Sequence, residues 1–373
     1  MKKILILQLL GKSFGGVWQV NRTIGEKFIK LGYDVTVVFL RDNKTDLVVE
    51  HDPKLKLCTI NEIDDWNEIP RKIDILKGKV TLSKYLKEKK KLANDFNNLK
   101  KYIVEKQPNY IITSHYQLLE GIPEEYLSRV IHEQHCSFLE SYSHKATREM
   151  LYKYNGKIKI VWLSKKSCSC AIEKGYKNCS YIYNAVRFNS DSKADVIKNK
   201  KLVTISRFSE EKRLDLMIKI VKDVFNDSRV DDWNFEIYGS GPTEGKMIDA
   251  IGNYERIKIM GRTNSPKDVL LGSSINLNTS AFEGFSLSVL EANECGIPTV
   301  SFNFGESAEE LILDNKTGII AVDESTYKDE LLELMLDSDK LENMSNECKE
   351  FNKNFNIDNI INEWLKLFES IDG

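Results

Sequence analysis

One stretch in the second half of the sequence combines two glutamates, a glycine and the expected start of a helix. Glu283 and Gly284 come first, and Glu291 follows Glu283 with seven residues between them. The run from Ser286 to Glu294 has helical character, so its first turn presents unpaired backbone N–H groups and the positive end of the helix dipole. Such an end favours a phosphate. Gly284, which has no Cβ, lets the backbone approach a ligand closely.

Basic residues and glycines follow other expected strands in the same half. They are Arg207, with Lys212 shortly after it, Gly239, and the pair Gly261 and Arg262. Because the carboxyl ends of parallel strands open onto one crevice, we expect these residues to face Glu283. Fixed cations there would stabilise the negative charge that develops on a diphosphate when a sugar leaves it. Each feature alone is equally well explained by a turn or a solvated helix, but their shared order favours a site.

The elements that must position these residues alternate between strand and helix patterns. Apolar runs of strand length occur at 4–10, 34–40, 108–115, 129–135, 157–164 and 180–186 in the first half, and at 201–208, 234–242, 256–262, 274–280 and 298–304 in the second. Helices are expected at 18–31, 215–225 and 354–371, and one or two amphipathic helices within the lysine-rich segment 73–106. This alternation predicts an α/β protein with two doubly wound parallel sheets.

Length and composition agree with that architecture. The 373 residues are too many for one ordinary core and suit two domains. The polar run 188–200 is typical of an interdomain linker, so the domains are predicted as 1–187 and 188–354. A net charge of −2 gives no basic field for nucleic acid. The seven cysteines favour free thiols in a reducing cytoplasm, and we expect neither a signal peptide nor a membrane-spanning segment.

The order of these segments resembles the second domain of the family 4 glycosyltransferases, which have the GT-B fold. The resemblance rests on SRFSEEKR, IYGSGP, IMGR and EGFSLSVLEANECGIPTV, and the two glutamates match the family's E-x7-E motif. It is weaker in the first half. There Gly15 and Gly16 resemble the glycine loop that contacts donor phosphates, and IYNAV, with Asn184, resembles the segment that closes the first domain. Two departures are Ser286, where glycine or proline is usual, and Val17-Trp18 after the glycines.

The resemblance implies two Rossmann-like domains that face a central cleft, with the final helix, 355–373, crossing back to the first domain. It implies that Arg207 and Lys212 hold the diphosphate, that Gly261 and Arg262 lie along the base, and that Glu283 contacts the donor sugar. The remaining donor-binding positions would be Gly239, Gly284, Phe285, Ser286, Leu287 and, at the ribose, Glu291. The family transfers sugars with retention of anomeric configuration and needs neither a metal nor another cofactor. The sequence agrees, since it has no acidic triplet at a strand end.

Three histidines of the first half lie within or at the end of expected strands. His135 fits the family's donor-sugar contact best, and His115 lies at an earlier strand end where a second contact is common. His132 lies within a strand and is expected to be structural. Trp18 could line the acceptor side or cover the first helix, and the sequence does not decide between them.

The resulting hypothesis is a retaining hexosyltransferase. It would move a hexose or N-acetylhexosamine from a nucleotide sugar, with UDP as the expected nucleotide, to an acceptor hydroxyl in cell-surface glycan synthesis. The acceptor could be a lipid-linked glycan, a wall or capsule polymer, or a protein. Alternatives are a GT-B epimerase or phosphorylase, or a non-catalytic partner subunit. We expect a cytoplasmic protein, and Lys87–Lys91 could bring it to the inner membrane face, although a solvated helix explains them too.

Overall fold

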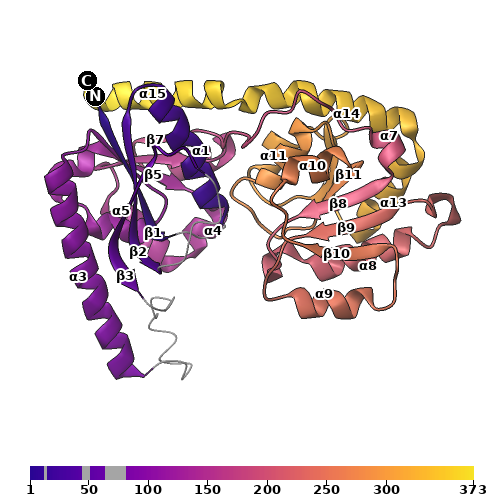
Figure 1. Ribbon diagram of the computed structural model, residues 1–373, viewed down its shortest axis with the longest axis horizontal. Coiled ribbons are helices and arrows are strands. Elements are labelled where there is room, and N and C mark those ends of the chain that lie inside the picture. Colours follow the sequence, from indigo (N-terminus) through magenta and orange to yellow (C-terminus); the bar gives the residue numbers. More distant parts are fainter. Residues whose placement is uncertain (12–14, 44–50, 64–80) are drawn as a thin grey trace.

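The computed structural model describes residues 1–11, 15–43, 51–63 and 81–373, and contains two parallel β-sheets (Figure 1). The first sheet has the order β3-β2-β1-β4-β5-β6-β7. Its strands are β1 (Lys3–Leu10), β2 (Asp34–Asn43), β3 (Lys56–Ile63), β4 (Tyr110–Thr113), β5 (Val130–Gln134), β6 (Lys159–Trp162) and β7 (Cys179–Tyr181). The first strand has six consecutive buried residues, five of them apolar, as expected of a strand covered on both faces.

The second sheet has the order β10-β9-β8-β11-β12-β13. Its strands are β8 (Lys201–Ile205), β9 (Asn234–Tyr238), β10 (Ile257–Gly261), β11 (Ile275–Asn278), β12 (Thr299–Phe302) and β13 (Gly318–Ala321). In both sheets every recorded strand pair is parallel. The two doubly wound sheets predicted from the alternating pattern are therefore confirmed.

Each sheet has one place where the direction of strand order reverses. In the first sheet it lies between β1 and β4, and in the second between β8 and β11. The loops that leave two neighbouring strands at such a point run in opposite directions, which opens a crevice at the carboxyl ends of the strands.

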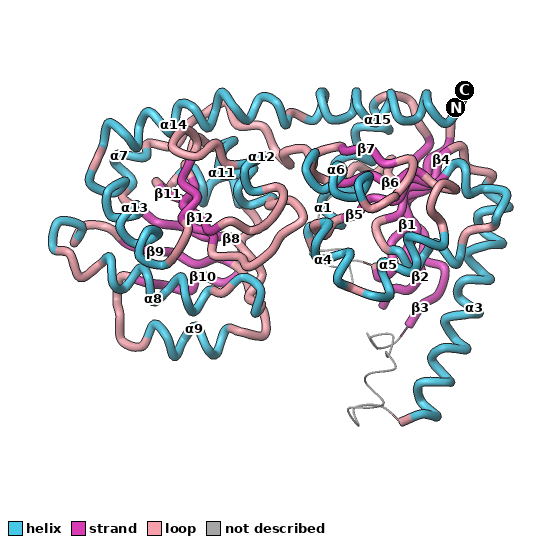
Figure 2. Tube along the Cα trace, turned by 180° about the vertical axis from the view of Figure 1, so that it is seen from behind, coloured by secondary structure: helices cyan, strands magenta, loops and turns pink. Residues whose placement is uncertain are grey.

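Helices cover both sheets (Figure 2). Those of the first half are α1 (Gly16–Lys30), α3 (Leu82–Lys106), α4 (Phe138–Ser143), α5 (Lys145–Lys153) and α6 (Lys165–Glu173), with the 3-10 turns η1 (Tyr116–Gly121) and η2 (Glu124–Arg129). Those of the second half are α7 (Val196–Asn199), α8 (Leu214–Val224), α9 (Glu244–Ile251), α10 (Pro266–Leu271), α11 (Leu287–Glu294), α12 (Ala308–Leu311), α13 (Glu324–Leu336) and α14 (Ser338–Asn352), with the 3-10 turns η3 (Glu210–Lys212) and η4 (Ser228–Val230). The turn η5 (Lys353–Phe355) then leads into α15 (Ile357–Asp372).

The last two helices run along one side of the molecule and join its two halves (Figure 1). Helix α14 packs on α11 of the second half, whereas α15 packs on α1 of the first. Trp364 and Phe368 of α15 are both 1 % exposed and share a core with Phe28 of α1. The chain therefore begins and ends on the first sheet.

Several elements differ from the sequence expectations. The strands β3 and β13 were not predicted, and neither were α13 and α14. In β3 the sequence KLCTINEI mixes charged and apolar residues because this strand lies at the edge of its sheet, paired only with β2. The run 188–200 is polar but not a free linker, since Ala194 and Val196 are each 2 % exposed and belong to the second core. Of the lysine-rich segment, 82–106 forms one helix, and 73–80 lies outside the described residues.

Candidate active site

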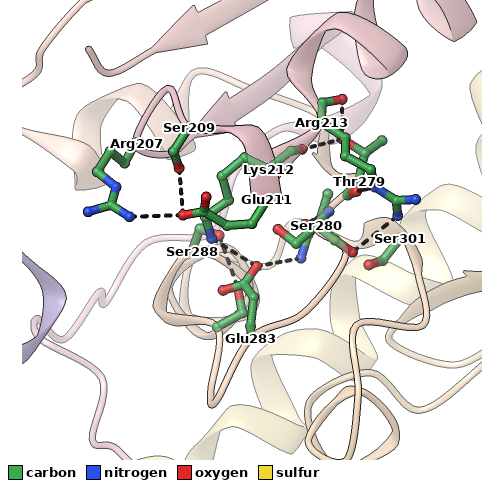
Figure 3. A network of polar contacts seen from close by, with 12 residues as sticks. Arg207, Ser209, Glu211, Lys212, Arg213, Thr279, Ser280, Glu283, Ser288 and Ser301 are labelled. Carbon is green, nitrogen blue, oxygen red and sulfur yellow. Dashed lines mark hydrogen bonds and ion pairs between the residues drawn. The ribbon is translucent and has the colours of Figure 1, made fainter. Parts of the chain in front are cut away.

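The reversal point of the second sheet brings together a lysine and a glutamate that the sequence predicted to meet. Lys212 ends the turn after β8, and Glu283 lies in the loop after β11. The Nζ of Lys212 is 3.1 Å from Oε1 of Glu283, and the same oxygen accepts a hydrogen bond of 3.2 Å from Nδ2 of Asn278. The Lys212 and Glu283 side chains are 19 % and 11 % exposed. They thus form a partly buried pair that still reaches solvent (Figure 3).

Arg207 stands beside this pair and is held by a carboxylate that was not predicted. Its Nη2 donates to Oε1 of Glu211 at 2.9 Å, and the hydroxyl of Ser209 donates to the same oxygen at 2.6 Å. Burial raises the pKa of Glu211, but these hydrogen bonds outweigh burial and lower the pKa to about 2. The Arg207 side chain is 72 % exposed. It is therefore an accessible cation whose guanidinium is paired with Glu211.

Backbone contacts tie the loop after β8 to the loop after β11 (Figure 3). Arg213 donates from Nε to the carbonyl of Thr279 at 2.6 Å, and the Thr279 hydroxyl donates back to the carbonyl of Lys212 at 2.8 Å. The backbone N–H of Ala281 donates to the carbonyl of Glu211 at 2.8 Å. The positions of Lys212 and Glu283 are thus set by rigid loops rather than by their side chains alone. Nothing in the sequence marks Arg213 as functional, and its role of joining the two loops is visible only in the structure.

Two of the predicted glycines are required by the backbone around them. Gly239 has φ +143°, and a Cβ there would lie 1.8 Å from the carbonyl oxygen of Ser206, at the end of β8. Gly261 has φ +75° with open space around it, so its conformation rather than crowding favours glycine. Its carbonyl accepts from the Gly239 N–H at 2.8 Å. Beside them Arg262 donates from Nε to the Ser240 hydroxyl at 2.6 Å. The ends of β8, β9 and β10 therefore adjoin, and the expectation that these residues face Glu283 remains a prediction.

Gly284 meets the first half of the molecule. A Cβ on Gly284 would lie 1.9 Å from the carbonyl oxygen of His135 and 3.1 Å from Cα of Cys136. The close approach that glycine allows here is thus to another part of the chain, whereas the sequence suggested a ligand. The contact also brings the Glu283 loop next to the end of β5. The ends of β5 and β11 therefore lie next to each other across the two halves.

The residues at the start of α11 are largely packed away from solvent. Phe285 is 6 % exposed and lies between the rings of Tyr183 and Phe355, with centroids 5.6 and 5.9 Å away. Ser286 is the residue before the helix and is fully buried. Leu287 packs against the same apolar cluster, and its Cδ1 would lie 3.4 Å from a Cβ built on Gly16. Their side chains hold the two halves together, so a ligand would meet their backbone groups.

Glu291 is paired with an arginine that the sequence analysis did not single out. Both of its carboxylate oxygens accept from Arg187, Oε1 from Nε and Oε2 from Nη2, the latter at 2.7 Å. Glu291 is 2 % exposed. Burial lowers the pKa of the Arg187 guanidinium, but attraction to Glu291 outweighs this and raises it. The expected ribose contact of Glu291 remains a prediction, and its carboxylate is fully engaged in this structure.

The first sheet contributes a polar group at the ends of β4 and β5. Nε2 of His135 lies 3.2 Å from the Ser114 hydroxyl and 3.7 Å from Oε2 of Glu133, which is 2 % exposed. Asn21 of α1 donates to the same hydroxyl at 3.2 Å. The buried Glu133 carboxylate and the Ser114 hydroxyl lie beside Nε2 and orient the imidazole. His135 is therefore a positioned, partly exposed histidine, and Glu133 and Ser114 are partners that the sequence did not reveal.

Of the other two histidines, His132 is fully buried and His115 is partly buried. His132 is fully buried and its Nε2 lies 3.0 Å from Oε1 of Gln134, in agreement with the structural role expected for it. Burial lowers the pKa of His132 and of His115 to about 4, with the nearby histidines adding repulsion. Both are neutral near pH 7. Nδ1 of His115 is a buried polar atom without a hydrogen-bond partner in the described part of the chain.

Four further predicted residues lie in the first half. Gly15 and Gly16 are exposed at the start of α1, at the reversal point beside β1. Trp18 is 1 % exposed and packs against Phe39, with ring centroids 5.7 Å apart. Of its two open roles, the structure shows core packing. Asn184 is 4 % exposed, so it offers little surface to a sugar.

A second pair of contacts between the halves involves two glutamates after β12. Glu310 accepts from the backbone N–H groups of Lys165 and Lys166 at 2.9 and 2.8 Å and from the Tyr183 hydroxyl at 2.8 Å. Glu306 accepts from the backbone N–H of Leu139 at 2.9 Å. The acceptors thus sit at the starts of α6 and α4, where N–H groups lack helical partners and the dipole favours a carboxylate. No sequence pattern indicated these contacts.

In the ranges that the structure describes, no group of three or more His, Cys, Asp and Glu side chains is placed to hold a metal ion. None of the helices described is both long and apolar enough to cross a bilayer.

Comparison with known proteins adds to this geometry. Residues 187–351 match the family model described as Glycosyl transferases group 1. An uncharacterized glycosyltransferase of Haemophilus influenzae is 24 % identical over 98 % of this chain and 99 % of its own length. A poly(ribitol-phosphate) alpha-N-acetylglucosaminyltransferase of Staphylococcus aureus is 30 % identical, over 44 % of this chain and about a third (34 %) of its own length. These matches support a glycosyltransferase.

Among solved structures, S. aureus TarM in a complex that contains UDP has a TM-score of 0.77 at 14 % identity, and the likeness covers 99 % of this chain and all of that one. At this identity the likeness speaks for the fold alone. Together with the two parallel sheets, it confirms the expected GT-B architecture.

Proposed function

We propose that this chain is a retaining, UDP-sugar-dependent glycosyltransferase of family 4 that moves a hexose or N-acetylhexosamine to an acceptor hydroxyl. The observation that carries the proposal is the Lys212–Glu283 pair, 3.1 Å apart, at the reversal point of the second sheet. Arg207 is held next to the same turn by Glu211, and the carbonyl of His135, at the end of β5, lies against Gly284 of the Glu283 loop. Cations and a carboxylate that could bind sugar hydroxyls thus lie where a doubly wound sheet binds ligands.

The chemistry follows from the charges of these groups. As the bond from the anomeric carbon to the diphosphate breaks, negative charge grows on phosphate oxygens and positive charge on the sugar ring. Arg207 and Lys212 would stabilise the phosphate, and the carboxylate of Glu283 would bind sugar hydroxyls. In the proposed course the acceptor oxygen attacks the same face that the diphosphate leaves, and its proton passes to a leaving phosphate oxygen. His135 would donate a hydrogen bond to the donor sugar.

This assignment needs neither metal nor another cofactor, because the two cations and the start of α11 supply the positive charge. UDP is proposed on two grounds. It is the nucleotide that the resemblance suggests, and a UDP complex of TarM shares the fold. The acceptor is proposed to be a cell-surface glycan or glycoconjugate, in line with the relative named for poly(ribitol-phosphate). The exposed lysines near Lys87–Lys91 on α3 would bring the protein to an anionic membrane, which vesicle co-sedimentation tests.

The assay is transfer by the purified protein from a panel of UDP-, GDP- and ADP-sugars, preceded by a thermal-shift screen of the same donors, because selective binding raises apparent stability. Lys212→Ala and Glu283→Ala should each abolish transfer while the protein stays folded. Lys219→Ala is the matched control, since this lysine is 64 % exposed and pairs with Glu324 on the surface. Near-wild-type transfer by Lys212→Ala or Glu283→Ala would overturn the role given to that residue.

The product distinguishes the remaining alternatives. Retention predicts that the new glycosidic bond has the anomeric configuration of the donor, which nuclear magnetic resonance reads directly. Conversion of the nucleotide sugar to its epimer without transfer would instead indicate an epimerase, and release of a sugar phosphate on addition of phosphate would indicate a phosphorylase. Failure to bind any nucleotide would indicate a non-catalytic subunit.

A further inference from the structure

One ring nitrogen of His135 is held by residues from three elements of the first half. Its Nε2 lies 3.2 Å from the hydroxyl of Ser114, which follows β4, and 3.7 Å from Oε2 of Glu133 in β5. The Ser114 hydroxyl donates to that carboxylate at 3.5 Å and accepts from Nδ2 of Asn21 in α1 at 3.2 Å. Glu133 and Asn21 are 2 % and 0 % exposed. The surroundings of Nε2 are therefore set by the interior of the protein.

These contacts decide which ring nitrogen carries the proton. A carboxylate can only accept hydrogen bonds, and a hydroxyl has a single proton to donate. Because Ser114 gives its proton to Glu133, the two oxygen atoms near Nε2 are both acceptors toward the ring. An unprotonated Nε2 would point its lone pair at two acceptors and gain no hydrogen bond. Nε2 is therefore the protonated nitrogen, and Nδ1 of the neutral ring is an acceptor.

The other ring nitrogen is free to meet a ligand. Among the described residues Nδ1 of His135 has no hydrogen-bond partner, and it is not one of the buried polar atoms that lack a partner, so it reaches solvent. The His135 side chain is 13 % exposed. The carbonyl oxygen of the same residue would lie 1.9 Å from a Cβ built on Gly284. The free acceptor thus belongs to a residue that touches the loop of Glu283.

We propose that Glu133 is a positioning residue that acts through Ser114 and His135. It keeps the proton on Nε2, so that Nδ1 accepts a hydrogen bond from a sugar hydroxyl. The proposal rests on the function proposed above and refines its histidine contact, because the sugar hydroxyl becomes the donor and His135 the acceptor. If Glu133 only filled space within the sheet, glutamine of the same shape would leave the proton of the ring where it is.

Nuclear magnetic resonance of the whole protein tests the position of the proton. The ¹⁵N chemical shifts of an imidazole distinguish its two neutral tautomers, and they are recorded at alkaline pH, where histidine is neutral. His135→Gln identifies the signals of His135 among those of the five histidines. The wild type should carry the proton on Nε2. Glu133→Gln should move it toward Nδ1, because the new amide group can donate to Nε2. Glu149→Gln, at a 65 % exposed side chain of α5, is the control and should leave the signals unchanged.

Transfer kinetics test whether this proton matters for the reaction. Glu133→Gln should lower kcat/KM roughly tenfold, which corresponds to the loss of about one hydrogen bond. In a His135→Gln background the same substitution should change kcat/KM by less than about twofold, because residues that act through one another do not have additive effects. A merely structural role for Glu133 predicts the same loss in both backgrounds.

The outcomes separate the possible failures. The proposal is overturned if the wild type carries the proton on Nδ1, if Glu133→Gln leaves the tautomer or the transfer rate unchanged, or if its effect does not depend on His135. Should Glu133→Gln fail to fold, Ser114→Ala answers the same question. It removes the hydroxyl that links the ring to the carboxylate, and it should slow transfer in the wild type but not in His135→Gln. Absence of transfer from every donor by the wild type would instead contradict the proposed function, and the tautomer measurement would still decide the role of Glu133.

Discussion

Glu310 is predicted to hold the two halves of the protein in the arrangement seen here. Its carboxylate accepts three hydrogen bonds, from the N–H groups of Lys165 and Lys166 and from the hydroxyl of Tyr183. These donors belong to the first half of the chain, whereas Glu310 lies in α12 of the second. Replacement by alanine removes all three bonds at once and leaves the rest of both sheets unchanged.

The size of the effect follows from these bonds. Hydrogen bonds to a charged group contribute about 1.5–3 kcal/mol each when they are well shielded. Lys165 and Lys166 are exposed, so water replaces the lost acceptor, and a value of roughly 1 kcal/mol per bond is appropriate. Glu310→Ala should therefore weaken the contact by about 3 kcal/mol, which is roughly a hundredfold change in the equilibrium between closed and separated arrangements.

Small-angle X-ray scattering measures this change directly, because separation of the halves increases the radius of gyration. Transfer activity should fall in parallel, since the site includes groups from both sheets. Glu309→Ala is the matched control, because the Glu309 side chain is 63 % exposed and makes a single ion pair of 3.5 Å with Lys166. If Glu310→Ala has the scattering curve and activity of Glu309→Ala, the assigned role of Glu310 is wrong.

Two further predictions concern the interface and the buried histidines. Gly284→Ala should force the Glu283 loop away from His135, because its Cβ would lie 1.9 Å from the His135 carbonyl oxygen, and kcat/KM should fall at least tenfold; Gly245→Ala, in α9 with open space around it, should not reduce activity. A comparable kcat/KM for both variants would contradict the steric argument. The pKa values of His115 and His132 are lowered to about 4 in the folded protein. Between pH 6.5 and 4 the unfolded chain therefore binds protons that the folded chain does not, and the free energy of unfolding should decrease as the pH falls through that window. Urea midpoints measured from pH 7.5 to 4.5 should fall less steeply in His115→Gln than in the wild type, and equal slopes would refute the assignment.

Much of the fold was predictable because its signals are local. Apolar runs separated by helical patterns predicted parallel sheets, and the order of strand ends predicted that Lys212 and Glu283 would face the same crevice. The two residues lie close together because β8 and β11 are neighbours at the point where the strand order of the second sheet reverses. The strand β3 was not predicted, because its sequence mixes charged and apolar residues. This is common in an edge strand, which is less buried than a central one.

The partners of the site residues were not predictable in this way. Arg187 and Glu291 are 104 positions apart, and Glu310 is 145 positions from Lys165. Nothing in the sequence near Arg187 marks it as different from a solvated arginine, and Glu310 stands next to the exposed Glu309. The sequence left the role of Trp18 open, and the structure shows that Trp18 packs in the core. For Gly284 the sequence suggested a nearby ligand, whereas the structure shows a close approach to His135.

The sequence by itself determined the two parallel sheets and the residues at their strand ends, because periodicity and strand order act within or between neighbouring segments. Only the tertiary structure decided that Glu291 is held by Arg187, that Glu310 and Glu306 cap helices of the other half, and that Gly284 touches the end of β5. These contacts depend on how two separately formed sheets meet. The side chains that join the halves carry no periodic signal, because each one is positioned by partners that lie far away in the sequence.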